Sequence, residues 1–141
     1  YILLVVTTIV IYCIWKNRAC KNAWLLTPHA MTVTPAWAVG WYFIPIANLW
    51  KPFGAMREIV GASCPDKPPF ALVGWWWALW IITSIAGRIS FRAALSEDID
   101  VYVISNYVDL GVTPLSIALD LILLVLIRRI TKGQFQQVSR S

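Results

Sequence analysis

The stretch FALVGWWWALWIITSIAG, from Phe70 to Gly87, decides the fold class of this chain. It carries no charged side chain, and a helix of this length reaches ~27 Å, close to the ~30 Å hydrocarbon core of a bilayer. Its first half holds the indole rings of Trp75, Trp76, Trp77 and Trp80. Tryptophan favours the headgroup region of a bilayer, so the stretch predicts a transmembrane helix that begins at an interface.

The composition of the whole chain agrees with this prediction. Its 141 residues are 59% apolar and 13% charged, and the mean hydropathy is +0.66. Soluble domains carry about twice that charged fraction and, at this size, leave about a third of their surface exposed. Composition therefore excludes a soluble globular domain, a disordered tail and a disulfide-rich module. It indicates an all-α membrane protein whose residues 1–141 form a single helical membrane domain.

Two further apolar stretches predict transmembrane helices, at about residues 1–15 and 110–127. Both end at basic residues, and Pro114 falls where a helix starting near residue 110 would have its first turn, a position that needs no backbone donor. A helix of residues 1–15 reaches only ~22 Å, which is too short to cross. We therefore expect the sequence to begin inside a helix and one more helix to lie upstream of residue 1.

Residues 35–62 predict a re-entrant or interfacial element. The run PAWAVGWYFIPIANLWKP is interrupted by Pro45, which removes a backbone hydrogen bond, and by Asn48 and Pro52. Such a break at membrane depth can bind ions through freed carbonyls, whereas at the interface the carbonyls meet water. Residues 52–63 that follow have the spacing of a short amphipathic helix lying on the membrane surface.

The charges predict an orientation. Ten of the twelve basic residues fall in residues 16–69 and 128–141, against Glu58 and Asp66. Residues 88–109 hold the other two basic residues and four acids. The positive-inside rule then places residues 35–69 and the C-terminus in the cytoplasm of a bacterial inner membrane, in a multi-pass protein.

Asp120 is the sharpest single candidate site. A carboxylate at a helix centre costs about 2.5–3.5 kcal/mol on insertion scales, so it should face protein or water. Ser116 lies one turn away on the same face, and partner hydroxyls are available at Thr7, Thr8, Thr83 and Ser84. Two readings stay open: a hydrogen bond that fastens helices together, or a proton or cation site.

Other candidates are contact residues rather than catalytic ones. Interfacial aromatic anchors are expected at Trp37, Trp41, Trp50, Trp75, Trp76, Trp77 and Trp80, and headgroup-binding cations at Lys16, Arg18, Lys21, Arg57, Arg128 and Arg129. Bound lipid is expected, with a pigment or quinone stacked on tryptophan as an alternative. No catalytic constellation, metal site or other cofactor is predicted, and no soluble basic patch suits nucleic acid.

The sequence also resembles a known family. The matching pieces are the Trp15, Arg18 and Asn22 pattern, the block TPAWAVGWYFIPIANLWKPFGAMREI (residues 34–59), GWWWALW (residues 74–80) and the ending LIRRITKGQ (residues 126–134). In these it is similar to the bacterial membrane proteins of domain-of-unknown-function family 4328. The resemblance implies a multi-span membrane protein with a further upstream helix, and it implies no activity, cofactor or site residue.

These observations together predict a non-catalytic integral membrane protein. We expect an accessory or scaffold subunit of a larger membrane complex, respiratory or photosynthetic, that acts through contacts with lipids and with other subunits or further copies of itself. The alternative is a small oligomeric transporter or channel that uses Asp120 and the break at Pro45. A membrane enzyme acting on lipid or quinone is a third, weaker hypothesis.

Overall fold

The described part of the chain is helical, without strands. The structure is a computed structural model, and it describes residues 2–96 and 98–140. Five α-helices follow in order: α1 (Ile2–Leu26), α2 (Pro35–Gly40), α3 (Lys51–Ser63), α4 (Phe70–Ala94) and α5 (Ile99–Val138). Short 3-10 turns connect them: η1 (Pro28–Ala30), η2 (Trp41–Phe43) and η3 (Ala47–Leu49).

Three of these helices, α1, α4 and α5, are long and apolar enough to cross a membrane. The prediction of three such helices is therefore confirmed, and the chain is a multi-pass helical protein. The predicted end of the first helix at Trp15 is wrong, because α1 continues to Leu26. Basic residues such as Lys16 and Lys21 are good helix formers, and the first residue unable to continue the helix is Pro28.

Helix α5 differs most from its predicted limits. It begins at Ile99 and runs for 40 residues to Val138, which corresponds to ~60 Å, about twice the thickness of the hydrocarbon core. Pro114 therefore lies inside the helix and not in its first turn. Its ring leaves the Leu110 carbonyl without the usual backbone donor, which a helix tolerates when the flanking turns hold. Arg128 and Arg129 likewise do not end the helix.

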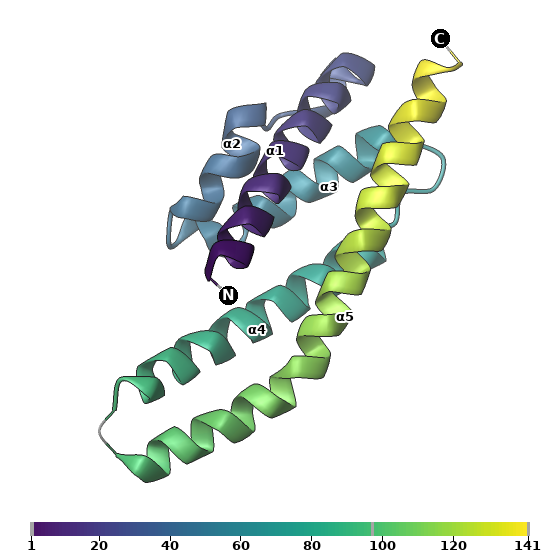
Figure 1. Cartoon of the computed structure of the whole chain (residues 1–141). Helices are drawn as coiled ribbons and strands as arrows, with labels where there is room; N and C mark the ends of the chain where they lie inside the picture. The colour runs from purple at the N-terminus through teal and green to yellow at the C-terminus, as the bar shows by residue number, and fades with distance from the viewer. Residues whose placement is uncertain (1, 97, 141) are drawn as a thin grey trace. The chain divides into compact units, whose positions relative to one another are not determined.

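The chain divides into two compact units. The first comprises Tyr1–Val73 and Leu126–Ser141, and the second comprises Gly74–Val125. In the first unit α1, α2 and α3 pack against one another (Figure 1). The apolar side of α3, with Met56, Ile59 and Val60, is fully buried there. The amphipathic helix predicted over residues 52–63 is thus present, and its apolar side contacts protein.

A carboxylate fixes the connection that precedes α2. Glu58 on α3 accepts hydrogen bonds from the Thr32 amide (2.8 Å), the Thr32 hydroxyl (2.5 Å) and the Val33 amide (3.0 Å). Thr34 then caps α2 by accepting from the Trp37 amide, and Pro35 occupies the first turn, where it needs no donor. These bonds hold the chain between α1 and α2 against α3.

The second unit contains a helical hairpin formed by α4 and α5. Small side chains on α4 are buried at one face, at Ala86, Ser90 and Ala93, which are spaced by four and three residues. Ser105 of α5 is buried as well, and the Ser90 hydroxyl donates to the Asp109 carboxylate at 2.5 Å. Small residues of this spacing let two helix backbones approach closely, as is common in membranes.

Candidate functional site

Asp120 lies on an exposed face of α5. Its side chain is exposed, and within the described residues it makes no hydrogen bond or ion pair. Ile117 and Leu124, three residues before and four after, lie on the same face of the helix and are 56% and 51% exposed. A carboxyl group thus sits in the middle of an apolar surface that the described chain leaves uncovered. We call this surface the Asp120 face.

The hydroxyls proposed as partners for Asp120 are largely satisfied within their own helices. Thr7 and Thr8 donate to the carbonyls of Leu3 and Leu4, at 2.8 and 2.9 Å. Thr83 donates to the Trp80 carbonyl at 3.2 Å. Ser116 donates to the Val112 carbonyl at 3.3 Å. Each of these four hydroxyls therefore already has an acceptor within its own helix, and its oxygen can still accept a hydrogen bond.

Lys16 is the most deeply enclosed charged residue of the first unit, with none of its surface exposed. Its ammonium donates to the Tyr42 hydroxyl at 2.8 Å and lies 4.4 Å from the centre of the Tyr42 ring. The Tyr12 and Tyr42 hydroxyls are 3.0 Å apart. Burial raises the pKa of Tyr42 well above its ordinary value, so this hydroxyl stays neutral. Lys16 thus joins α1 to the 41–52 segment and is not on the surface that headgroups contact.

The break at Pro45 forms a closed turn. The backbone N–H of Asn48 donates to the Ile44 carbonyl at 2.8 Å, which closes a turn around Pro45. The next α-helix begins at Lys51. The side-chain oxygen Oδ1 of Asn48 is buried without a hydrogen-bond partner. Pro52 is buried against Lys16, and Pro45 is exposed. Between α2 and α3 the chain thus forms only short 3-10 turns, and Oδ1 of Asn48 is a buried polar atom of this segment without a partner.

Four of the tryptophans form two stacked pairs. Trp37 and Trp41 stack with ring centres 4.4 Å apart, and Trp77 and Trp80 stack at 4.7 Å. Trp50 and Trp75 are exposed, as interfacial anchors require, whereas Trp76 is buried. The ring pairs lie between neighbouring turns of the same segment, so much of their stacking surface is already used within the chain.

The remaining cationic candidates are exposed. Arg57 lies over the rings of Phe53 and Phe70, at 5.8 and 5.1 Å. The others extend from α1 and α5, at Arg18, Lys21, Arg128 and Arg129. Their positions suit contact with an anionic surface, in contrast to that of Lys16.

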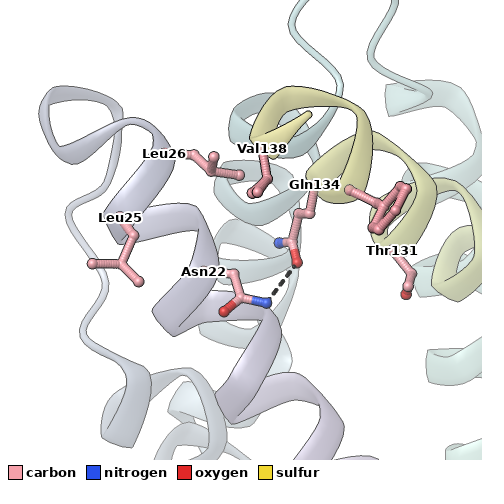
Figure 2. Close-up of a pocket in the computed structure, with 7 residues that line it drawn as sticks. Asn22, Leu25, Leu26, Thr131, Gln134 and Val138 are labelled. Atoms are coloured by element: carbon pink, nitrogen blue, oxygen red, sulfur yellow. Dashed lines mark hydrogen bonds between the residues drawn. The ribbon is translucent and has the colours of Figure 1, made fainter. Parts of the chain in front are cut away.

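A glutamine junction near the end of α5 was not predicted. Gln134 donates to the Ala19 carbonyl and the Ser63 hydroxyl, both at 2.9 Å. It accepts from the Asn22 side chain at 3.1 Å (Figure 2). It thereby joins α5 to α1 and α3. Beside it lies a groove of about 310 Å³ that is mostly apolar, with Leu25, Leu26, Phe135 and Val138 in its walls.

The junction depends on a glycine. A Cβ added at Gly133 would lie 2.1 Å from the Ser63 carbonyl oxygen, so only a residue without a side chain allows α5 to approach α3 this closely. One signal in the sequence could have indicated this contact: Gln134 and Gln137 are three residues apart and share a helix face. Two amides on one face of an apolar helix predict a polar contact with another element.

The fold defines a multi-pass helical membrane protein with a packed polar junction at Gln134 and, within the described residues, one carboxyl group exposed on an apolar face of α5. Residues 1–132 match the family described as domain of unknown function (DUF4328), and the chain belongs to that family. The resemblance of residues 34–59 and 74–80 to this family is thereby confirmed. No curated protein and no solved structure matches the chain.

Proposed function

We propose that this protein is a non-catalytic subunit of a larger assembly in the bacterial inner membrane, and that it holds a neighbouring transmembrane helix at the Asp120 face of α5. The observation that carries the proposal is the exposure of Asp120 within an apolar segment. Facing lipid, an ionised carboxylate costs about 2.5–3.5 kcal/mol on insertion scales. A partner helix that supplies a hydrogen bond removes much of this cost.

The surroundings of Asp120 support a helix partner. Ile117 and Leu124 present apolar surface on either side of the carboxyl group. Thr113, also on this face, uses its hydroxyl on the Asp109 carbonyl at 2.8 Å. A partner helix therefore meets one polar group with apolar flanks, an arrangement that fixes the register of two helices.

The distribution of charge supports an orientation. Arg128, Arg129 and Lys132 follow the apolar part of α5, while Asp100 and Asp109 lie on its other side. The positive-inside rule then assigns the end of α5 and the C-terminus to the cytoplasm.

Extraction of the full chain in a mild detergent, followed by mass analysis of co-purifying proteins, tests this function. We expect unrelated subunits in fixed stoichiometry with the native chain and with Asp120→Asn, which keeps a hydrogen-bonding side chain. Asp120→Leu should lose them. Thr113→Val is the matched control, because its hydroxyl is bonded within α5, and it should retain the partners.

Two results would contradict the proposal. If Asp120→Leu retained the same subunits as the native chain, the Asp120 face would not hold them. If the chain purified as a homo-oligomer that conducts ions in liposomes, the alternative of a transporter or channel that uses Asp120 and the Pro45 break would replace it.

A further inference from the structure

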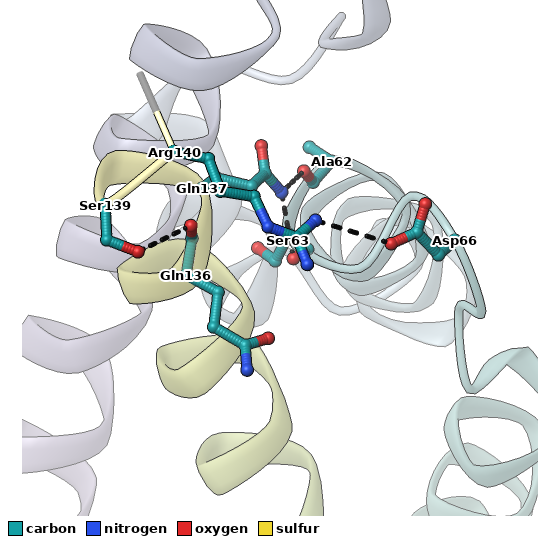
Figure 3. A network of polar contacts seen from close by, with 7 residues as sticks. All are labelled: Ala62, Ser63, Asp66, Gln136, Gln137, Ser139 and Arg140. Carbon is teal, nitrogen blue, oxygen red and sulfur yellow. Dashed lines mark hydrogen bonds and ion pairs between the residues drawn. The ribbon is translucent and has the colours of Figure 1, made fainter.

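A cationic pocket lies between the loop after α3 and the last turns of α5. Its volume is about 310 Å³. Four of its lining residues are basic and one is acidic: Lys67, Arg129, Lys132 and Arg140 against Asp66. Figure 3 shows part of this region, with Arg140 directed toward Asp66 and Gln137 toward the end of α3. The pocket therefore carries an excess of positive charge at one place on the surface.

The pocket has a fixed wall. Gln137 donates to the carbonyls of Ala62 and Ser63, at 2.8 and 3.0 Å (Figure 3). These are carbonyls of the last turn of α3, where the helix dipole is negative and would repel an anion. Because the Gln137 amide satisfies them, they contribute less negative potential. The close approach of Gly133 to the Ser63 carbonyl keeps α5 in place beside them.

The positive charges of the pocket are little compensated within the chain. Arg140 lies 3.8 Å from Asp66, but both side chains are largely exposed, so this ion pair contributes little. Within the described residues, Lys67, Arg129 and Lys132 form no ion pair. Cations gathered around one cavity repel one another, and a bound anion relieves that repulsion.

The position of the pocket along the chain indicates the ligand. Lys67 precedes the start of α4 at Phe70 by three residues, and Arg129 follows the last residue of the apolar run of α5, Ile127, by two. Both cations therefore lie at the ends of membrane-spanning stretches, at the depth of the lipid headgroups. Arginine and lysine bind phosphate through charge-assisted hydrogen bonds.

We propose that this pocket binds the phosphate ester of an anionic phospholipid headgroup. The proposal is independent of the Asp120 face, because it concerns other residues and another ligand. Of the cations predicted from the sequence to bind headgroups, Arg129 lines this pocket, and the proposal adds Lys67, Lys132 and Arg140 to them. Phosphate in solution shares the chemistry of the headgroup, so the experiment must separate the two sources.

The test is a titration of phosphatidylglycerol into the purified full chain in a neutral detergent, with bound lipid counted by native mass spectrometry. The pocket variant is Lys67→Gln with Lys132→Gln. The matched control is Arg88→Gln with Arg92→Gln, which removes the same charge from exposed positions on α4 that are outside the predicted headgroup-binding set. Each cation near an anionic headgroup is worth about fivefold in affinity, so the pocket variant should bind about 25-fold more weakly and the control within about twofold of the native chain.

Parallel titrations with phosphatidylcholine and with inorganic phosphate complete the design. Weak binding of both, together with a loss confined to the pocket variant, would support the proposal. Equal losses in the pocket and control variants would overturn it, because charge alone would then explain binding. Displacement of phosphatidylglycerol by inorganic phosphate at an equal concentration would assign the pocket to a soluble ligand and overturn the lipid source. Circular dichroism of each variant confirms that it remains helical.

Discussion

Replacing Gly133 by alanine should loosen the end of α5 from α3. The added Cβ would lie 2.1 Å from the Ser63 carbonyl oxygen, whereas side-chain Cβ atoms keep at least 3.0 Å from such neighbours. Neither atom belongs to a flexible side-chain end, so the backbones themselves must separate. That movement strains the bonds of Gln134 and Gln137 to Ser63, at 2.9 and 3.0 Å.

The size of the effect follows from these contacts. Overpacking costs about 1–3 kcal/mol, and each weakened hydrogen bond adds about 1 kcal/mol. Alanine recovers up to about 1 kcal/mol through its helix propensity. Gly133→Ala should therefore lower the free energy of unfolding by about 2–4 kcal/mol. Gly111→Ala in the same helix has no neighbour within 4 Å of its Cβ and should leave stability equal or higher.

Unfolding in mixed detergent micelles, followed by circular dichroism and tryptophan fluorescence, measures both variants against the native chain. The comparison is direct because both substitutions are glycine to alanine within α5. If Gly133→Ala proved as stable as Gly111→Ala, the reasoning would be refuted, since α5 would then not pack on Ser63 as described.

Three further predictions concern the first unit. Glu58→Ala should lower the free energy of unfolding by about 1.5–3 kcal/mol, because the Thr32 and Val33 amides, which both donate to Oε2 of Glu58, lose their acceptor. An unchanged micelle-unfolding midpoint would contradict this. Tyr42→Phe should lower the free energy of unfolding by a similar amount, because the buried Lys16 ammonium loses an acceptor at 2.8 Å. Lys16→Met removes the buried charge together with its need for an acceptor, so its free energy of unfolding should stay within about 1 kcal/mol of that of the native chain. The same unfolding assay measures both variants. The pKa of Cys64 lies above its ordinary value of 9.0, because the raising effect of burial is larger than the lowering effect of the Arg129 charge. The Cys64 thiol should therefore be alkylated at pH 8 more slowly than glutathione, in a chain whose other cysteines are replaced by serine, with a rate that still rises above pH 9.

The apolar stretches of the sequence were enough to predict three long helices. The length of each helix was harder to predict, because basic residues such as Lys16 and Arg128 end a hydrophobic run without ending a helix. Pro114 was misplaced for a related reason: proline usually marks a first turn, yet α5 continues on both sides of it. Hydrophobicity locates a membrane segment and carries little information on where the helix stops.

Among the candidate sites, too, local sequence features could be predicted, whereas contacts between distant parts of the chain could not. The isolation of Asp120 in an apolar run is a property of the sequence and could be found there. The burial of Lys16 beneath Tyr42 and the junction at Gln134 depend on contacts between residues far apart in the chain, 26 residues in one case and 115 in the other for the bond to Ala19. Such contacts need the packing of α1, α3 and α5, which no local pattern specifies.

The most direct test of the central claim is photocrosslinking on α5 in native membranes. A photoreactive phenylalanine analogue at Leu124 lies on the Asp120 face, whereas at Val125 it lies about 140° around the helix from Asp120, and both positions are exposed. We predict a protein adduct from position 124 that disappears with Asp120→Leu, and none from position 125. Lipid adducts alone from position 124, or equal protein adducts from both positions, would contradict the claim that another helix covers the Asp120 face.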